Sequence, residues 1–227
     1  MLSRKTALVT GSTSGIGLAI ATALAEQGAD LSRPDEIEAM MAFAASRFGA
    51  VDVLVNNAGI QHVAAIEDFP VAKWDAIIAI NLCSAFHTTR LALPAMKARN
   101  WGRILNIAST HGLVASPQKS AYVTAKHGLV GFTKVTALET ARTGVTCNAI
   151  CPGFTLTPLI QPQLDARAGR EGVPAAALAD AFVAEKHPSG AFVQTAQLAA
   201  LAVFLCSDAA NEVRSAAWNM DGGWVAQ

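Results

Sequence analysis

The sequence predicts an α/β fold, a single domain over residues 1–227 built on one doubly wound parallel sheet, and three observations lead to it. Short β-rich runs alternate with longer helical patterns, a glycine-rich turn follows the first run, and polar residues stand directly after later runs. With 52% apolar and 15% charged residues, the 227-residue chain can bury one sizeable core. Seventeen basic residues balance seventeen acidic ones without a run of either sign. We therefore expect a small-molecule partner, and neither nucleic acid nor a membrane.

Strand and helix patterns alternate along the chain. Four short apolar runs read as buried strands, at 7–9, 51–55, 103–107 and 145–150, and residues 216–220 read as a last strand. Five patterns carry apolar residues at the three-to-four spacing of a helix, at 16–27, 34–48, 73–96, 121–141 and 195–206. Because parallel strands need crossover helices between them, this order favours a parallel sheet with helices on both faces.

The alternation fails at one point, between Asp30 and Leu31. Residues 26–30 read as a helix end and residues 31–34 as the next helix start, with Ser32 as N-cap and Pro34 in the first turn. No strand pattern lies between them, although a chain that leaves a parallel sheet through one helix must return through a strand. We expect that a strand-helix-strand unit of about thirty residues is absent here. Either the chain carries a real deletion, or a segment was closed up in the numbering.

Neither a targeting segment nor a membrane span is expected. Polar residues 1–5 lead into an apolar run, 6–10, that is too brief for a signal-peptide core, and we find no 18-residue apolar stretch. Four scattered cysteines suit small buried side chains in a reducing compartment: Cys83, Cys147, Cys151 and Cys206. No nearby His or Cys completes a metal set with them. The sequence therefore predicts a cytoplasmic protein without a metal site.

A glycine-rich turn, Thr-Gly-Ser-Thr-Ser-Gly-Ile-Gly at 10–17, lies where the first strand turns into a helix. Its glycines permit close approach of the backbone to a pyrophosphate, and the helix N-terminus offers free N–H groups. The candidate cofactor contacts are Gly11, Thr13, Ser14, Gly15, Ile16 and Gly17. A plain structural turn would look the same, so this motif alone leaves both interpretations open.

A second polar motif, Asn56-Asn57-Ala58-Gly59, follows the predicted strand 51–55. Ligands bind at this edge of open parallel sheets, so Asn57, Ala58 and Gly59 are candidate contacts of an adenosine. Taken alone, an ordinary Asn-rich turn explains the pattern more simply.

Tyr122 and Lys126 are four residues apart in a helical pattern and share one face. A free tyrosine titrates near ~10, and a neighbouring ammonium group favours the phenolate, so the pair is a candidate general acid/base with a lowered pKa on Tyr122. Ser109 follows the predicted strand 103–107 and could donate to a substrate oxygen. Asn81 lies inside a helical pattern and needs a partner if it is buried. Each feature alone also has an ordinary structural explanation.

Together these features resemble the short-chain dehydrogenase/reductase family, whose fold is Rossmann-like. The resemblance rests on the order of motifs over nearly the whole chain: the glycine-rich turn, Asn-Asn-Ala-Gly, Asn81, Ser109, Tyr122-x-x-x-Lys126 and Cys151-Pro152-Gly153. It implies that Tyr122 is the general acid/base and that Lys126 holds the nicotinamide ribose and lowers the Tyr122 pKa. It also implies that Ser109 orients the reacting oxygen and that Asn81 supports a water-linked proton relay. By the same resemblance, Pro152, Gly153 and Thr157 contact the nicotinamide.

Polar residues near these motifs favour a small carboxylate as substrate. Lys119 offers a positive charge, and His111 and Gln61 offer hydrogen bonds, although a loop Lys or Gln is more often simply solvated. Three segments surround them: Asn-Asn-Ala-Gly-Ile-Gln-His at 56–62, Ala-Ser-Thr-His-Gly-Leu-Val-Ala-Ser at 108–116 and Asp-Gly-Gly-Trp at 221–224. These segments resemble the branch of the family that oxidises D-3-hydroxybutyrate to acetoacetate and catalyses the reverse. That resemblance implies a substrate site of Gln61, Ser109, His111, Lys119, Tyr122, Gln163 and Trp224. It also implies a mobile lid over residues 154–188.

The cofactor expected from this resemblance is NAD. Residues 12–14 contain no Arg or Lys for a 2′-phosphate, but the residue that reads the 2′ position normally follows the second strand, which this sequence lacks. Two alternatives remain open at this point: a related reductase of a 3-oxoacyl thioester or sugar, and an inactive truncated paralogue. A homotetramer is expected from the family, with the helices predicted at 73–96 and 121–141 as possible interfaces.

Overall fold

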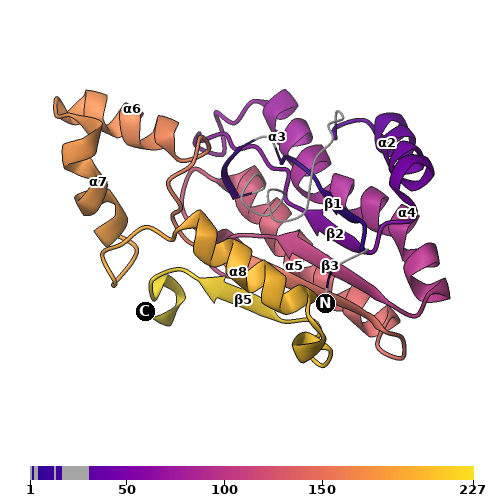
Figure 1. The fold of residues 1–227 in the computed structure, drawn as a ribbon. Helices are drawn as coiled ribbons and strands as arrows, with labels where there is room; N and C mark the ends of the chain where they lie inside the picture. The colour runs from indigo at the N-terminus through magenta and orange to yellow at the C-terminus, as the bar shows by residue number, and fades with distance from the viewer. Residues whose placement is uncertain (1, 3–4, 13, 17–30) are drawn as a thin grey trace.

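The computed structural model describes residues 2, 5–12, 14–16 and 31–227. Thr13, Gly17, most of the helix expected at 16–27 and the junction between Asp30 and Leu31 lie outside the described residues. The strands are β1 (Ala7–Val9), β2 (Val53–Asn56), β3 (Gly102–Ile107), β4 (Val145–Pro152) and β5 (Ala217–Met220). The helices are α2 (Pro34–Phe48), α3 (Val71–Ile78), α4 (Ser84–Ala98), α5 (Ser120–Glu139), α6 (Gln161–Glu171), α7 (Ala175–Ala184) and α8 (Thr195–Cys206). Figure 1 shows their arrangement.

The described strands form one parallel sheet in the order β1-β2-β3-β4-β5, which confirms the predicted fold class. A doubly wound sheet of the dinucleotide-binding kind has two further strands outside its first strand. Among the described residues, no strand pairs with the outer side of β1.

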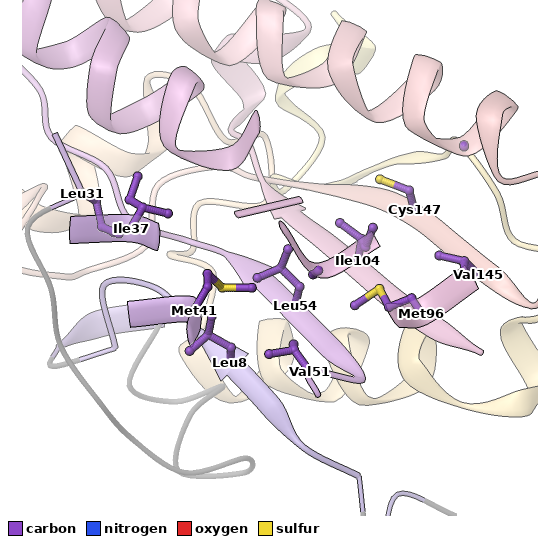
Figure 2. Packing of buried hydrophobic residues seen from close by; sticks show 12 residues of the cluster. Leu8, Leu31, Ile37, Met41, Val51, Leu54, Met96, Ile104, Val145 and Cys147 are labelled. Carbon is purple, nitrogen blue, oxygen red and sulfur yellow. The ribbon is translucent and has the colours of Figure 1, made fainter. Parts of the chain in front are cut away.

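Alternate strand residues point to opposite faces of the sheet, because side chains in a strand have a period of two. Val53 and Val55 pack with α8 on one face, in a cluster that includes Leu198. Leu54, between them, points to the other face and joins a cluster with Met41 of α2. Figure 2 shows this second cluster, which residues from α2, α4 and the strands build together. Helices therefore cover both faces, as the sequence predicts.

The helix expected at 73–96 is longer than predicted and is not regular. A π-helical turn, Ala79–Cys83, separates α3 from α4 and contains Asn81. By length and composition the combined run, Val71–Ala98, could cross a membrane, and 39% of its most apolar window is buried inside the protein. A helix that packs in the core of a folded domain passes the same test, and Lys73, Asp75 and Arg90 interrupt the apolar residues of this run. Cys83 is exposed on this run, whereas the other three cysteines are buried as predicted.

One expectation near another helix needs correction, and one segment contains helices that the sequence did not predict. The N-cap position of α2 is Arg33 rather than Ser32, because Pro34 already occupies the first turn. The segment expected only as a lid, 154–188, contains two helices, α6 and α7, which extend beyond the edge of the sheet at the left of Figure 1. They enclose their own apolar cluster with Phe154 and Trp224.

Candidate active site

A cavity of about 420 Å³ opens at the carboxyl ends of the parallel strands. Gly11 follows β1, Asn57 follows β2, Ser109 follows β3, and Gly153 follows β4, and all four residues line it. Open α/β sheets bind their ligands at this edge, and the volume lies within the range of small-molecule sites. The cavity thus lies where the motifs predicted it.

Most candidate residues lie together around this cavity. Those that line it are Gly11, Ser14, Gly15, Ile16, Asn57, Ala58, Gly59, Gln61, Ser109, His111, Lys119, Tyr122, Lys126, Pro152, Gly153, Thr157 and Trp224. Asn81 and Gln163 do not line it, but each bonds to a residue that does. The structure thus brings the proposed cofactor and substrate contacts into one continuous cleft.

The glycine-rich turn lies directly against the Asn-Asn-Ala-Gly loop. Gly11 has φ of 62°, and a Cβ at this position would be 2.9 Å from Ala58 Cα, so only glycine fits there. The Asn57 side-chain amide donates to the carbonyls of Thr10 and Gly11, both at 3.0 Å. This contact fixes a smooth, glycine-lined floor that suits the close approach of a dinucleotide backbone.

Asn81 is buried, and its amide has the partners that the sequence requires. Its Oδ1 accepts from the Ile60 N–H at 2.9 Å, and its Nδ2 donates to the Ile60 carbonyl at 2.9 Å. A Cβ on Gly59 would lie 3.6 Å from the same Oδ1. Asn81 therefore holds the loop at Ile60, between Gly59 and Gln61, against the π-helical turn Ala79–Cys83.

Tyr122 and Lys126 are both buried on α5 beside Ser109. Burial raises the pKa of Tyr122 to about 12, and a hydrogen bond with Ser109 works in the opposite direction. Burial likewise lowers the pKa of Lys126 to about 8. The lowered Tyr122 pKa expected from the sequence is therefore not found. The Lys126 ammonium is directed to the Ile107 carbonyl at 2.7 Å, and lies 5.7 Å from the centre of the Tyr122 ring.

Polar groups from three elements meet at the other end of the cavity. Lys119, just before α5, donates to Gln163 Oε1 of α6 at 3.1 Å. His111 Nε2 pairs with Ser116 Oγ at 3.0 Å, and its ring meets the Trp224 ring edge-to-face at 5.1 Å. Burial, followed by the charge of Lys186, lowers the pKa of Lys119 to about 8. This end combines one cation with neutral donors, as a carboxylate would require.

His111 makes stability depend on pH in a direction that can be tested. Its pKa is lowered from 6.5 to about 3, by burial first and by the charge of Lys119 second. Below pH 6.5 the unfolded chain binds a proton at this group that the folded chain excludes. The free energy of unfolding should therefore decrease as the pH is lowered, by about 1–2 kcal/mol from pH 6.5 to pH 5. Urea titrations across this range measure the slope.

The matched control is His127, which is exposed on α5. We expect His111→Asn to flatten the dependence of unfolding free energy on pH and His127→Asn to leave it as in the wild type. An unchanged slope in His111→Asn would rule out His111 as its source.

The sequence did not identify several residues of the cavity wall, nearly all of them apolar. These are Leu31, Ile60, Ile80, Ile107, Ala108, Phe154, Thr155, Pro158, Leu159 and Ile160. Most of them are next to a motif residue in the chain, and this closeness alone could have indicated that they line the cavity. Leu31 has no motif beside it, because it directly follows the break in the pattern. Its place in the cavity wall depends on the folded structure.

The chain is similar over nearly its whole length to several known proteins. The chain is 64% identical over 258 aligned positions to the D-beta-hydroxybutyrate dehydrogenase of Cupriavidus necator, covering 100% of both chains. It is 48% identical to the enzyme of the same name from Rhizobium meliloti, covering 98% of this chain and 99% of that one. A solved structure of actinorhodin polyketide ketoreductase with NADPH has a TM-score of 0.91 at 35% identity, covering 99% of each chain.

The first alignment also bears on the break after Asp30. It runs over 258 positions, whereas this chain has 227 residues, so at least 31 positions (258 less 227) have no residue here. That difference matches the length of one strand-helix-strand unit. Residues 28–168 match the family described as short chain dehydrogenase. The chain belongs to the short-chain dehydrogenase/reductase family, whose members are oxidoreductases that use a nicotinamide cofactor.

Proposed function

We propose that this protein catalyses the NAD-dependent oxidation of D-3-hydroxybutyrate to acetoacetate and the reverse reaction. The observation that carries the proposal is Lys119, a half-buried cation that lines the cavity and pairs with Gln163. A short hydroxy acid presents one carboxylate and one hydroxyl, and the cavity has a cationic end and a Tyr122-Ser109 pair to receive them. The two dehydrogenases that this chain resembles carry the same substrate in their names.

Each residue of the proposed site has its own role in the reaction. Bound NAD supplies the hydride acceptor. Tyr122 takes the hydroxyl proton in oxidation and returns it in reduction, while Ser109 donates to the same oxygen and orients it. Lys126 gives one of its three N–H donors to the Ile107 carbonyl, which leaves donors to hold ribose hydroxyls. Asn81 holds the loop at Ile60, and the relay expected of it stays a prediction.

The direction of the Tyr122 pKa has a consequence in this mechanism. With a pKa near 12, Tyr122 is protonated at neutral pH, which suits proton donation to acetoacetate. Oxidation needs the phenolate, so its rate rises with pH below that value.

The substrate end combines His111, Gln61 and Trp224 around Lys119. We propose that Lys119 and Gln163 bind the carboxylate, that His111 and Gln61 fix its orientation, and that Trp224 closes the pocket. Residues 154–188 are proposed as the lid, because Gln163 brings the start of α6 to Lys119.

NAD rather than NADP is proposed as the cofactor. The described part of the glycine-rich turn carries no cation for a 2′-phosphate. Gly11 and Gly15 have positive φ angles of 62° and 57°, which suit a tight turn that presents backbone N–H groups to a pyrophosphate. Without the expected second strand, few contacts reach the adenosine ribose, so we expect weak binding of the dinucleotide.

Assembly as a homotetramer in the cytoplasm is also proposed. Exposed apolar side chains on the helical surface of α3, α4 and α5 support it, at Val71, Phe86, Val135 and Leu138. Apolar patches of this kind mark protein contacts. Light scattering of the purified protein measures the number of copies.

A substrate and cofactor panel tests the proposal. We expect turnover of D-3-hydroxybutyrate, little of the L-enantiomer or of a 3-oxoacyl thioester, and a lower KM for NAD than for NADP. The D-beta-hydroxybutyrate dehydrogenase of Cupriavidus necator serves as positive control for turnover of D-3-hydroxybutyrate. Turnover of the thioester without oxidation of D-3-hydroxybutyrate would overturn the proposal.

A further inference from the structure

His187 is a fully buried imidazole just behind the wall of the cavity. It follows the C-terminal end of α7, where its N–H donates to the Val183 carbonyl at 2.9 Å. It does not line the cavity. Any effect that it has on the reaction therefore acts through its neighbours.

The ring fits between two glycines that belong to different segments. A Cβ added at Gly153 would lie 2.4 Å from His187 Nε2, and one added at Gly222 would lie 2.9 Å from its Nδ1. Gly153 follows β4 and lines the cavity. Gly222 precedes the C-terminal Trp224. Glycine is therefore required at both positions, because a side chain at either one would collide with the His187 ring.

Both ring nitrogens have backbone partners, and these allow only one protonation state. The Phe154 N–H lies 2.8 Å from Nε2, and because a backbone amide can only donate, Nε2 must accept. The Ala191 carbonyl lies 2.9 Å from Nδ1, and because a carbonyl can only accept, Nδ1 must carry the proton. The neutral Nδ1–H tautomer satisfies both contacts, whereas the other tautomer or the cation would oppose two donors at Phe154.

Aromatic contacts extend this arrangement to the cavity. The Phe154 ring is stacked on His187 at 5.6 Å between centroids, with an interplanar angle of 13°. Trp224 contacts both rings, at 5.0 Å from Phe154 and 6.0 Å from His187. Phe154 and Trp224 both line the cavity. A shift of the imidazole therefore moves two cavity walls and the end of the lid together.

We propose that His187 is a positioning residue, whose Nδ1–H tautomer joins the end of α7, the Gly153–Phe154 wall and the Trp224 wall into one closed arrangement around the substrate. Its effect on turnover rests on the function proposed above. The contact that matters is acceptance of the Phe154 N–H by Nε2, since that bond ties together the two ends of the segment 154–188.

Two amide variants separate this contact from simple filling of space. Glutamine can place an acceptor near the position of Nε2, whereas asparagine reaches only the position of Nδ1. We expect His187→Gln to keep the KM for D-3-hydroxybutyrate within about twofold, and His187→Asn to raise it about tenfold, since a buried N–H then has no acceptor. In both variants kcat should change less than about threefold, because no reacting atom is touched. A role confined to stability would lower the melting temperature without separating the two KM values.

The tautomer is measured independently of turnover. Nitrogen-15 correlation spectra of the cofactor-free protein resolve its five histidines, and the signals lost in His187→Gln identify His187. We expect a protonated Nδ1 and an unprotonated Nε2. Equal KM values in the two variants, or a proton on Nε2, would overturn the proposal. If the wild type fails to oxidise D-3-hydroxybutyrate, the proposed function fails, and the spectrum still decides whether this arrangement exists.

Discussion

Tyr122→Phe is expected to lower kcat for D-3-hydroxybutyrate oxidation by about 10³–10⁴-fold, because it removes the proton acceptor and leaves the ring in place. The ring is buried on α5 and contacts His111 edge-to-face at 5.9 Å, so the packing should survive the loss of one hydroxyl. Binding of NADH, followed by its fluorescence, should change little. Rates are measured from NADH absorbance, and thermal melting checks the fold.

The same variant gives a direct measurement of the Tyr122 pKa. Tyr122 is the only tyrosine in the chain, so tyrosinate absorbance at alkaline pH reports on this group alone, with Tyr122→Phe as the blank. Burial places the pKa near 12, and oxidation should therefore accelerate with rising pH while reduction does not. Normal turnover by Tyr122→Phe, or an oxidation rate that falls as pH rises, would remove Tyr122 from the acid/base role.

Lys119→Ala is expected to raise the KM for D-3-hydroxybutyrate by about 10–100-fold. This is the loss of affinity expected when one charge-assisted hydrogen bond, of about 1.5–3 kcal/mol, is removed. Its effect on kcat should be smaller, because Lys119 meets the carboxylate and not the reacting carbon. Lys134→Ala is the matched control, since it removes one exposed lysine of α5 that does not line the cavity. Steady-state kinetics of the two variants at neutral pH give the comparison.

The lowered pKa of Lys119 adds a second test of this assignment. With a pKa of about 8, Lys119 loses its charge as pH rises through that value, so the wild-type KM should rise above pH 8. Lys119→Ala should not show that rise, and its preference for D-3-hydroxybutyrate over butan-2-ol, which lacks the carboxylate, should collapse. A KM for Lys119→Ala equal to that of Lys134→Ala would place the carboxylate elsewhere.

Much of the fold and the site could be predicted from the sequence because the signals are local. The alternation of Val53, Leu54 and Val55 between two sheet faces follows from the period of a strand, and α2 begins at Pro34 as its pattern indicates. Motifs that follow parallel strands must meet at one edge of the sheet, so the placement of Gly11, Asn57 and Ser109 together was also predictable.

Other features depend on segments that only the folded chain brings together. The sequence pairs Tyr122 with Lys126 by spacing, but burial raises the Tyr122 pKa, and the Ile107 carbonyl holds the ammonium. The α6 and α7 helices were missed because their composition, rich in Ala, Pro and Gly, suggests a loop, and they are stabilised by the cluster around Phe154.

Residue types and their spacing along the chain are enough to predict the α/β class, the order of the motifs, the break after Asp30 and the choice of Ser109, Tyr122 and Lys126 as candidates. The direction of the Tyr122 pKa shift, the pairing of Lys119 with Gln163 and the enclosure of His187 become visible only in the folded chain. The physical reason is that pKa values and tautomers depend on burial and on partners far apart in the chain, which no local pattern records.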